Sequence, residues 1–123
     1  MKIALSVLLL AVLSASADIS DLSGQWAGNV STESRGQPTV YPFVLVLRVE
    51  DTTITGTMGP QDGKAQPIKN ARLKGDQLTF EVDSDDVKVR FNLTLAGERL
   101  KGDIGGSDDG REFTGTIDLT RQK

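Results

Sequence analysis

A short pattern of alternating residues recurs four times along this chain: an apolar residue, any residue, glycine, any residue, and a second apolar residue. Alternate residues of a β-strand share a face, so each glycine is expected on the core-facing side of its strand. Glycine inside a strand marks a bend or a close approach of another backbone, and repeated inward glycines let a small sheet coil tightly enough to close. The copies are Trp26-x-Gly28-x-Val30, Ile54-x-Gly56-x-Met58, Leu100-x-Gly102-x-Ile104 and Phe113-x-Gly115-x-Ile117.

The rest of the chain follows the same two-residue period. Alternating runs recur at a spacing of roughly 10–14 residues and are separated by turn residues, which is typical of an all-β sandwich or barrel. The turn in Leu73-x-Gly75-Asp76-x-Leu78 returns in Leu95-x-Gly97-Glu98-x-Leu100, and serial hairpins favour a meander over a Greek key. We therefore predict an all-β, antiparallel, up-and-down barrel of about eight strands. The expected strands cover residues 24–33, 40–50, 53–59, 66–73, 78–82, 87–95, 100–104 and 113–121.

Three irregular places are also predicted. Residues 18–23 form a short polar lead that suits a turn of helix or 3₁₀-helix. Ile68 and Leu73 have opposite parity within one strand, which indicates a β-bulge near Asn70. Residues 105–110 are rich in glycine and aspartate, so we expect a loop there.

The first seventeen residues have the composition of a secretory signal peptide. Lys2 gives a positive start, residues 3–13 are an apolar run too short to span a bilayer, and Ala15-Ser16-Ala17 fits a small-residue cleavage site. No cysteine follows the run to carry a lipid anchor. We therefore expect a signal peptide over 1–17, a single β-barrel domain over 18–123, and an exported protein that is periplasmic or extracellular after cleavage near Ala17.

Charge and composition exclude several classes of function. Loss of Lys2 with the signal peptide would take the formal net charge from −3 to −4, which does not suit binding to nucleic acid or anionic lipid. We expect no membrane insertion. The chain has no cysteine, so core burial and sheet closure must hold the fold without disulfides. It also has no histidine, the commonest general base and zinc ligand.

No set of residues predicts an enzyme. A serine or threonine nucleophile needs an adjacent base, and no motif places a lysine or carboxylate beside one. The acidic clusters Asp83/Asp85/Asp86 and Asp103/Asp108/Asp109 lack the spacing of a calcium-binding loop, and aspartate is common in turns that hold no metal. We expect no catalytic residues, no metal and no cofactor.

Three residues at the two ends of the chain carry a resemblance to a known family. Gly24 and Trp26 form a Gly-x-Trp in the first strand, and Arg121 lies on the apolar face of the last. This arrangement resembles the lipocalin-like (calycin) barrels, and in particular small exported bacterial barrel domains that mostly lack an assigned activity. The resemblance implies that Trp26 lies at the closed end of the barrel and that Arg121 packs across it, where a cation–π contact would partner the buried guanidinium.

The barrel interior is the candidate binding site. An eight-stranded barrel is just wide enough to be filled by side chains or to hold one small ligand. A hollow interior would make this a non-enzymatic binder of a small apolar ligand, whereas a filled one favours an interaction or inhibitor-like module that binds a protein partner through its loops. If the inward glycines cluster, they could leave a pocket floored by Trp26. The candidate lining residues are Trp26, Phe43, Met58, Phe80, Phe91, Phe113 and Arg121.

One outward face is unusually apolar. Val40, Val44 and Val46 point away from the core of the second strand. Such a patch can mark a surface for a partner. The alternative, which we favour from the sequence, is that the N-terminal lead or the loop at 34–39 covers it.

Overall fold

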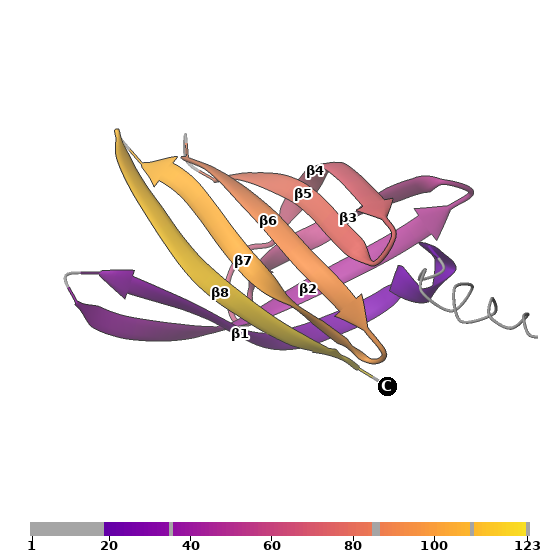
Figure 1. Cartoon of the computed structure of the whole chain (residues 1–123), viewed down its shortest axis with the longest axis horizontal. Helices are drawn as coiled ribbons and strands as arrows, with labels where there is room; N and C mark the ends of the chain where they lie inside the picture. The colour runs from indigo at the N-terminus through magenta and orange to yellow at the C-terminus, as the bar shows by residue number, and fades with distance from the viewer. Residues whose placement is uncertain (1–18, 35, 85–86, 109, 123) are drawn as a thin grey trace, which may run out of the picture.

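The chain folds into a single closed sheet of eight antiparallel strands (Figure 1). The computed structural model describes residues 19–34, 36–84, 87–108 and 110–122, without the side chains of residues 34, 84 and 108. The predicted signal peptide over 1–17 lies outside these residues. The elements are η2 (Ile19–Leu22), β1 (Gly24–Ser34), β2 (Gln37–Glu50), β3 (Thr53–Pro60), β4 (Gln66–Lys74), β5 (Gln77–Ser84), β6 (Val87–Ala96), β7 (Arg99–Asp108) and β8 (Arg111–Arg121).

The strands follow one another around the barrel in chain order, each pairing with the next. β1 closes the sheet because it pairs with both β2 and β8: Trp26 stands opposite Leu45 on one side and opposite Arg121 on the other. The predicted all-β, up-and-down barrel of eight strands is thereby confirmed. The predicted short 3₁₀ lead is also present, as η2.

The recurring glycines lie where neighbouring strands approach most closely. Three of them stand opposite a leucine of a neighbouring strand, and a Cβ on any of the three would lie 1.9 Å from the carbonyl oxygen that precedes that leucine. A side chain at these positions would therefore push the two backbones apart and open the coil of the sheet. The pairs are Gly28 with Leu119, Gly56 with Leu47, and Gly102 with Leu93.

Two strands are longer than the sequence indicates. β7 continues through most of the predicted loop at 105–110, because Gly105 and Gly106 pair with Thr114 and Phe113 of β8. The loop prediction is wrong there: an available partner strand outweighs the low strand propensity of glycine. β2 begins at Gln37 rather than at Val40, since its first residues pair with the end of β1 and extend the β1–β2 hairpin beyond the barrel wall (Figure 1).

The predicted bulge near Asn70 is confirmed. The register between β4 and β5 shifts between Lys69 and Arg72, and Asn70 has a φ of 55°, in the left-handed region that asparagine tolerates better than most residues. Its side-chain amide donates a hydrogen bond of 3.0 Å to Glu81 Oε1. The bulge lets Ile68 and Leu73 both contact the core despite their opposite parity.

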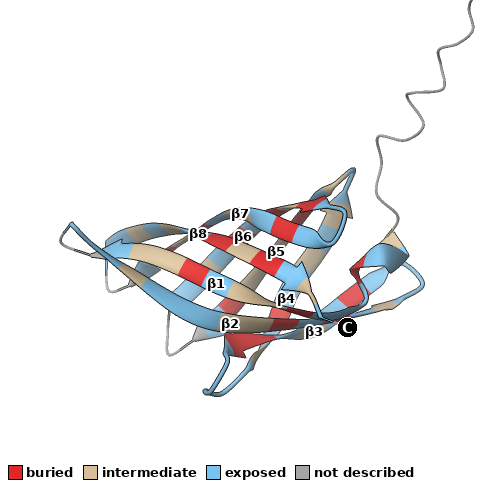
Figure 2. Ribbon diagram, turned by 90° about the horizontal axis from the view of Figure 1, so that it is seen from below, coloured by how far each residue is buried: buried red, intermediate tan, exposed pale blue. Residues whose placement is uncertain are grey.

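The buried side chains in the described part of the chain are all apolar and form one cluster inside the barrel. Figure 2 marks the positions of the buried residues along the ribbon in red. The most deeply buried of them include Leu22, Trp26, Leu45, Leu100 and Leu119. They come from the end of the barrel that η2 covers, so this half of the interior is solid. Among the described residues, the structure has no helix of the length and apolar character needed to span a membrane.

Candidate functional site

The two ends of the barrel differ. Antiparallel strands in chain order place alternate turns at opposite ends, so the turns at 51–52, 75–76 and 97–98 share one end with η2 and the C-terminus. We call this the closed end. The connection at 61–65 lies at the other, open end.

Trp26 seals the closed end. Its side chain is fully buried, and the indole Nε1 donates a hydrogen bond of 3.0 Å to the carbonyl oxygen of Leu22 in η2. Leu22 is fully buried as well. The apolar ring is therefore buried in the core, and its single polar group, the N–H, has a hydrogen-bond acceptor in the short helix that covers it.

Arg121 lies across Trp26, as the resemblance to the lipocalin-like barrels implies. Its guanidinium carbon is 4.4 Å from the centre of the indole ring, a cation–π geometry. Nη1 donates a 2.8 Å hydrogen bond to the carbonyl oxygen of Ser23, and Nη2 donates to that of Asp21. Nε forms an ion pair of 3.2 Å with Glu98. Arg121 thus fastens η2 and the last strand onto the closed end.

Replacing Arg121 with methionine should lower the free energy of unfolding by about 2 kcal/mol. Methionine keeps much of the apolar stem but loses the cation–π contact and both hydrogen bonds to η2 and Ser23. Urea denaturation followed by circular dichroism measures the loss. Arg99→Met is the matched control, since the ion pair of Arg99 with Asp118 is solvent-exposed and should contribute less than about 1 kcal/mol. Equal losses in the two variants would contradict this role for Arg121.

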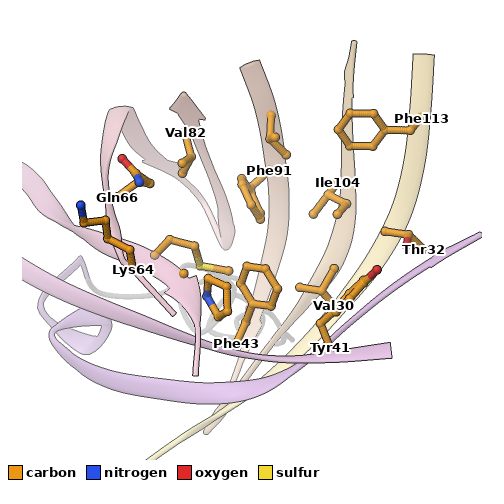
Figure 3. A pocket seen from close by; sticks show the side chains of 14 residues that line it. Val30, Thr32, Tyr41, Phe43, Lys64, Gln66, Val82, Phe91, Ile104 and Phe113 are labelled. Carbon is orange, nitrogen blue, oxygen red and sulfur yellow. The ribbon is translucent and has the colours of Figure 1, made fainter. Parts of the chain in front are cut away.

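A pocket of about 280 Å³ occupies the open half of the interior (Figure 3). Residues of all eight strands form its wall, and Lys64 of the β3–β4 connection forms part of its rim. Apolar and aromatic side chains dominate the lining, as in most small-molecule sites. The lining residues are Val30, Thr32, Tyr41, Phe43, Met58, Gly59, Pro60, Lys64, Gln66, Val82, Val89, Phe91, Ile104 and Phe113.

The structure brings together four of the seven candidate lining residues: Phe43, Met58, Phe91 and Phe113. Trp26 and Arg121 are at the closed end, so the pocket is not floored by Trp26. Phe80 lies directly opposite Phe91, and the two rings stack with their centres 4.6 Å apart. Phe80 is therefore packed against Phe91, one of the lining aromatics, and does not line the pocket itself.

Sequence reasoning missed several lining residues. Val30, Tyr41, Val82, Val89 and Ile104 have the inward parity of their strands, but facing inward does not distinguish the solid half from the hollow half. Parity gives the face of a strand and says nothing of the height along the barrel axis. Lys64 carries no strand parity at all, because it lies in a connection.

Four polar side chains lie in the pocket lining, on two opposite sides (Figure 3). Lys64 and Gln66 come from the β3–β4 connection and the start of β4. Thr32 and Tyr41 come from the β1–β2 hairpin, and Tyr41 is 47% exposed. The interior is therefore apolar at its depth and polar at its rim.

Outside the barrel, Lys69 and Asp83 form an exposed ion pair with a distance of 2.6 Å between Nζ and Oδ2. Their hydrogen bond raises the pKa of Lys69 and lowers the pKa of Asp83. Since both side chains are solvent-exposed, this is surface chemistry away from the pocket. Asp85, Asp86 and Asp109 of the two acidic clusters lie outside the described residues. Within those residues, no group of three or more acidic side chains is placed to hold a metal ion.

The outer face of β2 is less covered than the sequence led us to expect. Val40 is 58% exposed and Val46 is 41% exposed, while Val44 between them is half-buried. Neither η2 nor the described residues at 34–39 shield Val40 and Val46. The expectation that these segments cover the patch is wrong, because the β1–β2 hairpin runs straight out from the barrel instead of folding back.

Fold and pocket together define a class of protein: an antiparallel up-and-down barrel that is solid at one end and hollow at the other. This architecture is compatible with the lipocalin-like fold. A search with this sequence against protein-family models and against curated proteins finds no match.

Proposed function

We propose that this protein is a non-enzymatic binder of a small apolar molecule, which it holds in the pocket at the open end of the barrel. The observation that carries the proposal is the 280 Å³ pocket itself, because its depth is lined by apolar side chains. Apolar cavities can bind apolar molecules: an engineered, enclosed cavity of about 150 Å³ holds benzene. Burial of the ligand's apolar surface would supply most of the binding free energy.

The division of the interior supports this role. The closed half is held by Trp26, Leu22 and Arg121, so it provides a rigid base that does not depend on a ligand. The open half keeps a gap among Phe43, Phe91 and neighbouring side chains, although most protein interiors are filled to crystal-like density. A gap that costs packing energy is easier to explain if a ligand fills it.

We further propose that the protein belongs among the lipocalin-like (calycin) barrels of bacteria and is exported by the signal peptide at 1–17. The Gly24-x-Trp26 motif, the Arg121 contact and the meander topology support the first part. The charge, apolar run and Ala15-Ser16-Ala17 of the N-terminus support the second. N-terminal sequencing of the protein isolated from its own host tests export: a chain that begins at Met1 would contradict it.

Binding itself is tested by native mass spectrometry of the protein purified gently from its own host, followed by denaturation to release and identify any passenger. We expect a stoichiometric small apolar molecule. If only the unliganded mass is found, also after exposure to lipid extracts of the host, the proposal is wrong.

Replacing Val89 with phenylalanine should weaken the binding of an uncharged apolar probe, decanol, about tenfold or more. Val89 is a half-buried residue of the pocket wall, and a larger side chain would occupy the space that the ligand needs. Calorimetric titration of the purified protein measures the affinity. Val46→Phe is the matched control, because it makes the same change on the outer face of β2. Unchanged decanol binding by the Val89 variant would place the ligand elsewhere.

An interaction module is the alternative function, and one observation favours it. The exposed Val40 and Val46 lie on the outer face of β2, with Pro38 and Pro42 in the same row. An apolar row of this kind can contact a protein partner. This alternative predicts that Val40→Asp and Val46→Asp abolish the biological function while decanol binding is unchanged.

A further inference from the structure

A single charged side chain lines the pocket among the described residues, and it is positive. Lys64 reaches the pocket from the β3–β4 connection, next to the carboxamide of Gln66 (Figure 3). Its aliphatic stem can contribute to the apolar wall while its ammonium group stays at the rim, as is common for lysine.

The ammonium group of Lys64 is not neutralised by the described part of the protein. None of the ion pairs there involves Lys64, so no described carboxylate lies within 4.0 Å of its Nζ. By contrast, Lys69, Lys88 and Lys101 on the outside of the barrel all have carboxylate partners. The pocket rim therefore offers an ammonium donor, with a carboxamide beside it that can donate further hydrogen bonds.

Resting on the proposed function, we propose that the ligand is an anionic amphiphile: its carboxylate binds Lys64 at the rim, and its apolar body lies deeper, among Phe43, Met58 and Phe91. A hydrogen bond between an ammonium and a carboxylate is shorter and stronger than a neutral one. Among the described residues, no carboxylate that could bind a cationic head group lines the pocket. With an uncharged ligand, the ammonium group of Lys64 would have no ionic partner and would be solvated by water.

The pocket volume limits the apolar body. If about 150 Å³ holds benzene, then about 280 Å³ holds roughly eleven non-hydrogen atoms by the same proportion. A medium-length alkyl chain such as that of decanoate meets this limit with its head group at the rim. The chain of hexadecanoate exceeds this limit and would leave apolar surface in water. Hexadecanoate should therefore gain less affinity over decanoate than its extra chain length predicts.

The overall negative charge of the protein does not prevent the binding of an anion at Lys64. Exposed charges more than about 8 Å apart are largely screened at physiological ionic strength, whereas two charges in contact at the rim are screened only in part. Asp62 lies in the same connection as Lys64 and is exposed, but it makes no ion pair with it within the described structure. Its removal should strengthen the binding of an anion.

The experiment compares three probes with the same alkyl chain, decanoate, decanol and decylammonium, by calorimetric titration at physiological ionic strength and at a pH at which the carboxylate is ionised. We expect decanoate to bind more tightly than decanol, and decylammonium to bind least. Lys64→Met should weaken decanoate about five- to tenfold and leave decanol unchanged. Lys64→Glu should reverse the order of decanoate and decylammonium. Added salt should reduce the preference of the unaltered protein.

Lys74→Met is the matched control, since Lys74 is an exposed lysine at the far end of β4 and should not affect any of the probes. If decanol binds but decanoate binds no better, or if Lys64→Met leaves decanoate unchanged, the inference about the head group is wrong while the pocket proposal stands. If none of the probes binds, the proposed function fails and the inference fails with it.

Discussion

Replacing Trp26 with alanine is expected to lower the free energy of unfolding by about 3–5 kcal/mol. Trp26 is fully buried, so the change removes a large apolar side chain and leaves a cavity between η2 and the barrel. It also leaves the carbonyl of Leu22 without its donor and Arg121 without the ring it covers. Since small proteins are stable by only about 5–15 kcal/mol, this single change removes a large share of the total.

Urea denaturation followed by far-ultraviolet circular dichroism measures this loss, because the variant has no tryptophan fluorescence. Trp26→Phe serves as the control: it keeps an aromatic face under Arg121 but loses the N–H donor and part of the ring, so it should cost less than the alanine variant. A loss of less than about 1 kcal/mol for Trp26→Ala would mean that the closed end is held together without this ring.

Replacing Gly102 with alanine should destabilise the protein by about 3 kcal/mol, at the upper end of the range for overpacked sites. The new methyl group would lie 1.9 Å from the carbonyl oxygen of Asn92 and 2.8 Å from the Cα of Leu93. Both contacts are to backbone, which cannot rotate away as a side chain can. β6 and β7 would have to separate, and the coil that closes the barrel would open.

Gly105→Ala in the same strand is the matched control for this prediction. Gly105 faces outward, and its added Cβ would meet only the carbonyl oxygen of Phe113 at 3.6 Å, an ordinary contact. Neither glycine has a φ in the left-handed region, so the two variants differ in space and not in backbone conformation. We expect Gly105→Ala to change stability by less than about 1 kcal/mol in either direction. Thermal denaturation measures the melting temperatures of the two variants. Similar melting temperatures would refute the close-approach explanation.

The recurring glycines show that the structural role of a short motif can be predicted from sequence. Period-two alternation places Gly28, Gly56 and Gly102 on the inward face, and inward glycine has few structural uses besides a close approach of backbones. The inward face of Arg121 was inferred on the same grounds, whereas its contact with Trp26 was expected from the resemblance to the lipocalin-like barrels, with which this parity agrees. Both inferences depend on which face of a strand a residue occupies, and this is a local property of the chain.

The pocket could not be located in this way. Trp26 and Val30 share one face of β1, yet four residues along a strand span about 13 Å, so one fills the closed end while the other lines the pocket. Phe80 and Phe91 are likewise both inward, and they pair side by side across β5 and β6, yet only Phe91 lines the pocket. The place of Lys64 in the pocket lining could not be predicted either, because it depends on the path of a connection that has no periodic pattern.

The sequence by itself determined that this chain is all-β, that it forms an up-and-down barrel, and which residues face its interior, because two-residue periodicity and turn chemistry are encoded locally. The tertiary structure decided how the interior is divided into a filled and a hollow half and which charged group reaches the hollow one. It also carried β7 through residues expected to form a loop. These properties depend on the register between neighbouring strands, which sets the height of each side chain along the barrel and becomes fixed only when all eight strands pair.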